Sequence, residues 1–259
     1  MKRLTTRSIA ILLVTAVASS VATGGSAYAS PTSVTRVYTV VVSQANDHAF
    51  RQGVKDWNHC LKTAGAHHAI QAYDAETGNL DRYLFVVTYP DWAAMDQHGA
   101  AGKNCQGTFE KSVSAYVSGV TSHLDVPAAK MSYYPGGDVV KAPMLWVTHF
   151  RVKPGHWRQF KGGVEKLAAA AAKTHWQGHF LGLMTLGTGR NGYNFIVVWP
   201  NQNWADVGTQ PKPSQDAMMN GVYGKAVARM LDHEVGHSIA DIWSDIWKYD
   251  AALTYTPVK

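Results

Sequence analysis

The chain has 259 residues, of which 46% are hydrophobic and 16% charged, a composition typical of a globular protein and not of a disordered one. Its 24 Lys and Arg exceed its 18 Asp and Glu by a formal charge of +6, and these charges are scattered along the chain. No basic stripe of the kind that binds nucleic acid is present, so we expect no nucleic-acid partner.

The N-terminal segment has the pattern of a cleavable secretory signal. Three basic residues precede or flank an apolar stretch from Ile9 to Val21, which is short for a bilayer span, and Ala27-Tyr28-Ala29 is an A-x-A cleavage site. We expect a signal peptide over 1–29, cleavage after Ala29 and a secreted or periplasmic mature protein without a membrane span. A retained membrane anchor is the alternative. The mature chain would keep 21 Lys and Arg against 18 Asp and Glu, a charge near +3.

An internal repeat appears when the chain is shifted by 110 residues. Identical pairs in this register include Phe50 and Phe160, Gly53 and Gly163, Val54 and Val164, Tyr83 and Tyr193, Phe85 and Phe195, and Pro90 and Pro200. Because the matches fall at core-like positions in the same order, they predict two copies of one structural unit. We place the copies at 30–135 and 144–250, with a linker over 136–143 and a C-terminal tail over 251–259.

Each copy predicts the same series of elements. In copy one, the apolar periodicity predicts strands over 37–42, 69–73, 82–89 and 122–134, with helices from about 47 to Gly65 and over 108–120. In copy two it predicts strands over 145–152, 180–186, 193–199 and 239–249, a helix carrying Phe160 and Val164, and a second helix over 214–232. The order β-α-β-β-α-β is the ferredoxin-like unit, an antiparallel sheet with both helices on one face. The open faces of the two sheets are expected to cover one another.

This α+β organisation resembles the dimeric α/β barrel superfamily, with two tandem ferredoxin-like repeats closing an intrachain barrel. The resemblance is carried by the element order and by Tyr89-Pro90-Asp91-Trp92, which recurs in looser form at Trp199-Pro200 and Trp204. The superfamily includes antibiotic-biosynthesis-type monooxygenases, muconolactone isomerases, EthD-like and NIPSNAP-like proteins, and haem-binding chlorite dismutase relatives. The resemblance identifies no particular family and transfers no active-site residue.

Cys60 and Cys105 are the two cysteines of the chain. An even pair in an exported protein favours a disulfide, and the spacing matches no zinc pattern. Cys60 lies late in the first predicted helix and Cys105 just before the second, and these helices are neighbours in the ferredoxin-like unit. We therefore expect a Cys60–Cys105 bridge.

His233-Glu234-Val235-Gly236-His237 matches the H-E-x-x-H motif of zinc hydrolases. The repeat places it at the end of a helix that enters the last strand, and Gly236 is an expected helix stop. We therefore expect His233 and His237 not to share a helix face, and we assign no metal site. A zinc hydrolase using His233, Glu234 and His237 is kept as an alternative function.

Copy two differs from copy one by histidines at its first two predicted strands and by additional tryptophans. The candidate catalytic residues are His149 and His179, each on a predicted strand, and the candidate ligand-binding residues are Tyr193, Trp199 and Trp157. An apolar pocket with few polar groups is typical of a small-molecule site. We expect a small hydrophobic or aromatic ligand, acted on by monooxygenase-, isomerase- or haem-protein-like chemistry. The cofactor is unknown, and a monomer and a homodimer are both allowed. A non-enzymatic envelope interaction protein is a further alternative.

Overall fold

A computed structural model describes residues 32–96, 100–134, 142–186 and 194–257. Eight antiparallel strands form one closed barrel in the order β1-β3-β2-β8-β5-β7-β6-β4. The predicted signal segment, most of the linker and Tyr193 lie outside the described residues.

The first half of the chain contains four strands, and its main helices are α1 and α4. Its elements are β1 (Val34–Val41), a 3-10 turn (Gln44–Asn46), α1 (Asp47–Thr63), β2 (Gln71–Ala75), β3 (Arg82–Tyr89), α2 (Trp92–Asp96), α3 (Ala100–Asn104), α4 (Gln106–Ser112), a 3-10 turn (Ser114–Tyr116), β4 (Gly119–Pro127) and a 3-10 turn (Ala129–Met131).

The second half repeats this order, with its last long helix divided in two. Its elements are β5 (Met144–Val152), α5 (Trp157–Thr174), β6 (Leu181–Leu186), β7 (Phe195–Asn201), α6 (Trp204–Val207), α7 (Gln215–Tyr223), α8 (Lys225–Ser238) and β8 (Ile239–Tyr249).

Three elements predicted from the sequence differ clearly from the structure. The helix expected over 108–120 is α4, which ends at Ser112, and a 3-10 turn follows it. The helix expected over 214–232 is interrupted at Gly224, whose φ of 80° and ψ of 149° lie outside the helical region, and α8 continues to Ser238. The strand expected over 122–134 begins at Gly119 and ends at Pro127. Its first residues pair with β1 instead of continuing a helix, and proline has no N–H to extend the ladder.

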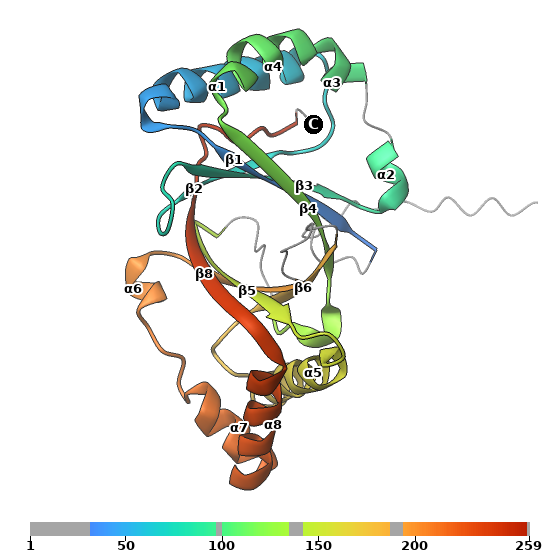
Figure 1. Cartoon of the computed structure of the whole chain (residues 1–259), viewed down its shortest axis with the longest axis vertical. Coiled ribbons are helices and arrows are strands. Elements are labelled where there is room, and N and C mark those ends of the chain that lie inside the picture. The colour runs from blue at the N-terminus through green and yellow to red at the C-terminus, as the bar shows by residue number, and fades with distance from the viewer. Residues whose placement is uncertain (1–31, 97–99, 135–141, 187–193, 258–259) are drawn as a thin grey trace, which may run out of the picture.

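The two halves close the barrel through two strand pairs that join them. β2 pairs with β8, and β4 pairs with β6, so four strands from each half make a continuous wall. Figure 1 shows the helices in two layers outside the barrel, with α1 and α4 on one side of it and α5, α7 and α8 on the opposite side. The tandem ferredoxin-like organisation and the intrachain barrel expected from the sequence are confirmed. One chain closes the barrel without a second copy.

Three layers of apolar side chains hold this arrangement together. One lies between the sheet and α1 and α4, a second lies between the sheet and α5, α7 and α8, and the third lines the inner face of the barrel. In the second layer Phe160, Phe180 and Phe195 are at most 1% exposed. Each such burial contributes about 1.5–3 kcal/mol, so the helices are fixed to the sheet by their apolar stripes and not by helix propensity alone.

The repeated glycines Gly53 and Gly163 mark the closest helix contact in each half. A Cβ on Gly53 would lie 1.6 Å from the backbone oxygen of Ser112, and one on Gly163 would lie 2.1 Å from Cγ2 of Val235. The repeat therefore preserves glycine where α1 meets α4 and where α5 meets α8.

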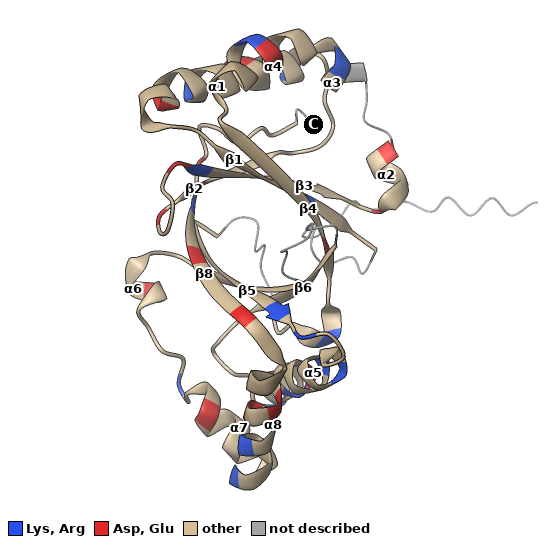
Figure 2. Ribbon diagram, viewed as in Figure 1, with Lys and Arg blue, Asp and Glu red and all other residues tan. Residues whose placement is uncertain are grey.

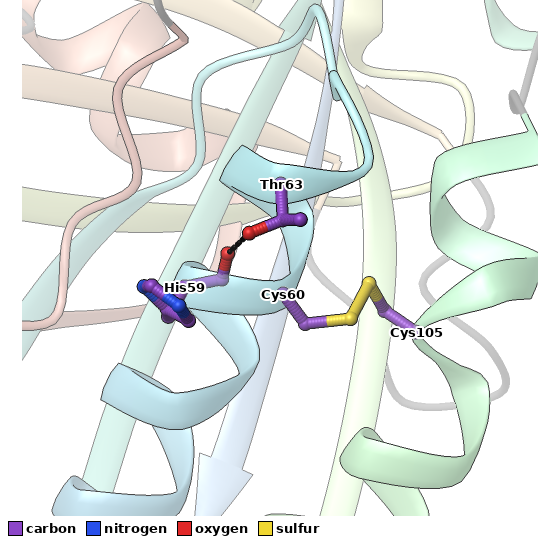
Figure 3. The surroundings of a disulfide bond; sticks show 4 residues. All are labelled: His59, Cys60, Thr63 and Cys105. Atoms are coloured by element: carbon purple, nitrogen blue, oxygen red, sulfur yellow. Dashed lines mark hydrogen bonds between the residues drawn. A yellow bond between two sulfur atoms is a disulfide. The ribbon is translucent and has the colours of Figure 1, made fainter.

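The Cys60–Cys105 disulfide is confirmed, and it ties α1 to the start of α4 (Figure 3). Its Cα atoms are 5.8 Å apart and it joins residues separated by 45 positions. Closing a loop of that length stabilises the fold by about 4 kcal/mol in the chain-entropy model.

The C-terminal tail packs against the first half. Tyr255 forms a β-bridge with Ile70, and the amide of Asn58 on α1 donates a hydrogen bond to the carbonyl oxygen of Leu253. Leu253 is fully buried. The end of the chain thus binds the two halves together beneath α1, where Figure 1 shows it.

Within the described ranges, none of the helices combines the length and apolar character needed to cross a bilayer.

Candidate functional site

The inside of the barrel is largely apolar, and one level of it contains charged and imidazole side chains that form a polar layer. Its apolar wall includes Val37, Val147, Leu183 and Ile196. Alternation along the strands places His123, His149, Arg82 and Asp245 on the same inner face, and the strand registers bring these four residues to one level of the barrel. Figure 2 shows that charged residues are sparse on the strands and that β8 carries acidic positions.

His149 lies beside a carboxylate that is held by an arginine. Its Nε2 is 3.8 Å from Oδ2 of Asp245, and its ring stacks on Trp243 with centroids 5.1 Å apart. Nη2 of Arg82 donates a 2.7 Å hydrogen bond to Oδ1 of Asp245. The guanidinium also lies over the ring of Trp247, 5.1 Å from its centroid. The group is therefore a continuous chain from imidazole to carboxylate to guanidinium to indole.

The turn between β2 and β3 is shaped to admit the Arg82–Asp245 pair. Gly78 has a φ of 72°, and a Cβ there would lie 2.8 Å from Nη2 of Arg82 and 2.9 Å from Oδ1 of Asp245. The hydroxyl of Thr77 accepts a hydrogen bond from the backbone N–H of Ile246, which fastens the turn to β8. Glycine is thus required both for the backbone conformation and for the close approach.

A second imidazole–carboxylate pair lies on β4. Nε2 of His123 is 3.3 Å from Oδ2 of Asp125, whose side chain is 1% exposed, and Oδ1 of Asp125 accepts a 2.7 Å hydrogen bond from the hydroxyl of Thr185. Buried polar clusters of this kind are costly to desolvate. Two of them inside an otherwise apolar barrel point to a use beyond packing.

The polar layer is close to an end of the barrel that solvent reaches. Exposure of the side chains falls from 43% and 51% at Arg151 and Asp241 to 12% at His149 and 9% at Asp245. Trp247, farther inward, is 2% exposed. A small molecule entering at the Arg151–Asp241 end would meet His149 first.

The charge state of His149 follows from its surroundings. Burial lowers its pKa to about 4; the carboxylate of Asp245 opposes this shift, and His123 and Arg82 add to it. At neutral pH the imidazole is uncharged, so it has a lone pair that can accept a proton.

The structure separates the other candidate residues from His149. His179 was expected on a strand, but it lies two residues before β6, where it is exposed and next to Tyr133 and Tyr134. Trp157 and Trp199 lie on the outer side of the sheet in the layer beneath the helices, where Trp157 contacts Phe160 and Trp199 contacts Phe180.

The H-E-x-x-H motif is not interrupted as expected. α8 continues through Gly236 to Ser238, and the rings of His233 and His237 are parallel and 6.0 Å apart, so the expectation that they do not share a face was wrong. Both histidines and Glu234 are exposed. Among the residues that the structure describes, no three His, Cys, Asp or Glu side chains are grouped so that they could hold a metal ion. The zinc hydrolase alternative gains no support.

The resemblance to haem-binding chlorite dismutase relatives raises haem as a cofactor, so the cavity in the helical layer of the second half was compared with the ligands that haem needs. A cavity of about 300 Å³ lies among α5, α7 and α8, and its lining includes Gly163, Leu167, Met219 and Arg229. No histidine, cysteine or tyrosine is among the described residues that line it, although these are usual axial ligands. Met219 is the one usual axial-ligand type among the described residues that line this cavity, and no step below uses haem.

Sequence reasoning missed Arg82, His123, Asp125, Asp245 and Thr185. One signal was available: His123 and Asp125, and likewise Asp245 between two tryptophans, occupy positions in strands where alternation points inward. A charged residue at such a position is unusual unless it is paired. Which partner each one meets depends on the pairing of distant strands and could not be read from the chain.

Comparison with known proteins supports the fold. No family model and no curated protein matches the chain. Its structure is similar to a candidate monooxygenase from Lactobacillus acidophilus, with a TM-score of 0.52 and 10% identity over 87% of this chain and 96% of the other. It is also similar to an anthrone oxidase-like protein, with a TM-score of 0.52 and 12% identity over 84% of this chain and 91% of the other. A chlorite dismutase from Candidatus Nitrospira defluvii has a TM-score of 0.50 and 8% identity over 85% and 92% of the two chains. These likenesses show the dimeric α/β barrel fold and nothing finer.

Proposed function

We propose that this protein is an exported acid–base enzyme that acts on a small hydrophobic or aromatic molecule inside its barrel. The observation that carries the proposal is the inward-facing His149 beside Asp245, in an apolar wall near an accessible end of the barrel. Perturbed titratable groups in such a setting are typical of functional sites.

The residues of the site suggest a division of roles. The neutral imidazole of His149 accepts a proton from a weakly acidic C–H or O–H group of the ligand. Asp245, 3.8 Å away, stabilises the imidazolium that forms, and Arg82 holds that carboxylate in place. The apolar wall excludes water and binds the body of the ligand. Proton abstraction of this kind begins both isomerisation and cofactor-independent oxygenation.

The comparisons support this class of reaction by analogy of fold. Two of the similar structures are a candidate monooxygenase and an anthrone oxidase-like protein. The same fold hosts different reactions, so the assignment to this chain depends on the geometry at His149.

Hydrogen–deuterium exchange tests the proposal without knowledge of the natural substrate. The mature protein is incubated in D₂O with a panel of aryl ketones and hydroxylated aromatic compounds, and deuterium uptake at carbon is followed by NMR. We expect the wild type to accelerate exchange for at least one member, with a rate that is constant above about pH 5 because His149 is then neutral.

The matched variants are His149→Ala and His179→Ala. We expect His149→Ala to lose at least 100-fold in exchange rate, the lower range for general-base catalysis, and the exposed His179→Ala to keep the wild-type rate. Equal rates for His149→Ala and the wild type would refute the role of His149.

Export is part of the proposal and has its own test. It rests on the N-terminal pattern and is consistent with the disulfide. The protein recovered from the periplasm or medium should begin at Ser30; an unprocessed chain in the cytoplasm would contradict export.

A further inference from the structure

We infer that the site takes an enolisable carbonyl compound, whose oxygen accepts a hydrogen bond from the indole N–H of Trp247 beside the guanidinium of Arg82. This inference rests on the proposed proton abstraction by His149 and names the substrate class for it.

The indole N–H of Trp247 is a buried hydrogen-bond donor without an acceptor among the described residues. Trp247 is 2% exposed and belongs to the apolar cluster that lines the barrel interior. Among the described residues, no acceptor forms a hydrogen bond with its Nε1. An unsatisfied buried donor is costly, and nearly all buried N–H groups in proteins have a partner. A ligand oxygen would supply one.

A series of contacts connects Trp247 to the proposed base. The guanidinium of Arg82 lies 5.1 Å from the centre of the indole, its Nη2 is 2.7 Å from Asp245, and Asp245 is 3.8 Å from His149. The registers place Trp247 one level farther into the barrel than Arg82 and His149. A molecule that enters at the Arg151–Asp241 end therefore passes His149 before it reaches Trp247.

The chemistry of these groups matches the formation of an enolate. When His149 takes the proton from the carbon next to a carbonyl, the C–H electron pair forms a C=C bond and the C=O π pair moves onto oxygen. The proton stays on the imidazolium until it returns to carbon or exchanges with solvent, so atoms and electrons balance without an oxidant. The developing oxyanion needs a donor and positive charge, which Trp247 and Arg82 supply in a water-poor interior.

The other buried polar groups of the barrel do not replace Trp247 in this role. Oδ1 of Asp125 already accepts a hydrogen bond from the hydroxyl of Thr185. His123 faces that carboxylate at 3.3 Å. The negative oxygen is therefore placed on the Trp247 side of the layer.

Binding of 4-nitrophenolate, a stable mimic of an enolate, tests the inference. The mature chain is titrated with 4-nitrophenolate and, separately, with naphthalene, which has an apolar body and no acceptor oxygen. Trp247→Phe removes the N–H and keeps an aromatic ring beneath Arg82. We expect it to weaken phenolate binding by about 10- to 100-fold, the usual loss for a hydrogen bond to a charged group, and to leave naphthalene binding unchanged.

The control is Trp204→Phe, on a residue of α6 that is 51% exposed and distant from the barrel interior. It should bind both probes like the wild type. In a ¹⁵N-labelled wild-type sample, the indole resonance that Trp247→Phe removes should shift on addition of 4-nitrophenolate.

The outcomes separate the two proposals. If the wild type catalyses exchange but Trp247→Phe binds the phenolate as tightly, the role of Trp247 is overturned while the acid–base function stands. Equal weakening for both probes would mean that the substitution only disturbs packing, which also overturns it. If the wild type neither exchanges nor binds any probe, both proposals are overturned.

Discussion

The acid sensitivity of folding should report directly on His149. The histidine has its usual pKa near 6.5 when unfolded and about 4 when folded. Between these values the unfolded chain binds more protons, so its free energy falls relative to the native state and stability decreases as the pH is lowered. From pH 7.5 to 4.5 this one group should cost about 2.5 kcal/mol, calculated from the two pKa values.

Urea unfolding of the wild type and His149→Phe at the two pH values measures this quantity. Phenylalanine retains a ring to stack on Trp243 and does not titrate. Asp74 acts in the opposite sense, because burial raises its pKa to about 6 and its native form is favoured by acid, but this contribution is common to both proteins and cancels. The acid-induced loss should therefore be about 2.5 kcal/mol larger for the wild type than for His149→Phe.

A parallel measurement on His179→Ala controls for the removal of an exposed histidine. It should keep the wild-type dependence on pH. If His149→Phe also kept it, His149 would not be held neutral in the barrel, and the reasoning that makes it a base would fail.

Two further predictions concern the repeated helix contacts and the disulfide. Gly163→Ala should destabilise the protein by about 1–3 kcal/mol in urea unfolding, and Val235→Ala should restore part of the loss by removing the methyl that the new Cβ meets at 2.1 Å. Gly53→Ala should be worse, with no such rescue, because its Cβ would meet a backbone oxygen of α4 at 1.6 Å. Replacing Cys60, Cys105 or both by Ser should lower the unfolding free energy by the same amount, about 4 kcal/mol; unequal losses would show that more than the cross-link was removed.

Much of the fold could be predicted because local patterns and the repeat agree. β3 and β8 were predicted with the bounds that the structure has, since β-branched and aromatic runs at these positions are bounded by turn residues. The repeat of Gly53 at Gly163 indicated equivalent helices before their contacts were known. The break at Gly224 was missed, because glycine within an apolar periodic stretch is compatible with a continuous helix.

Less of the site could be predicted, because enrichment along the sequence does not distinguish the two faces of a sheet. His149 was selected for its strand and its aromatic surroundings, and it faces the barrel interior. Trp199 was selected for the same reasons, but it lies on the outer face beneath the helices. Alternation could have separated these residues, since side chains two apart share a face. Arg82 and Asp245 belong to different halves, and nothing local to either indicates the other.

The sequence by itself therefore determined the two-copy organisation, the α+β class, the cysteine pair and the order and approximate positions of the elements, because each depends on local periodicity or on composition. Only the tertiary structure decided how the halves join. Pairing of β2 with β8 and of β4 with β6 closes the barrel, and its stagger sets His149, Asp245 and Arg82 at one level. Those contacts span 163 residues between Arg82 and Asp245, and they depend on the register of strands that are remote in the chain, which no local pattern specifies.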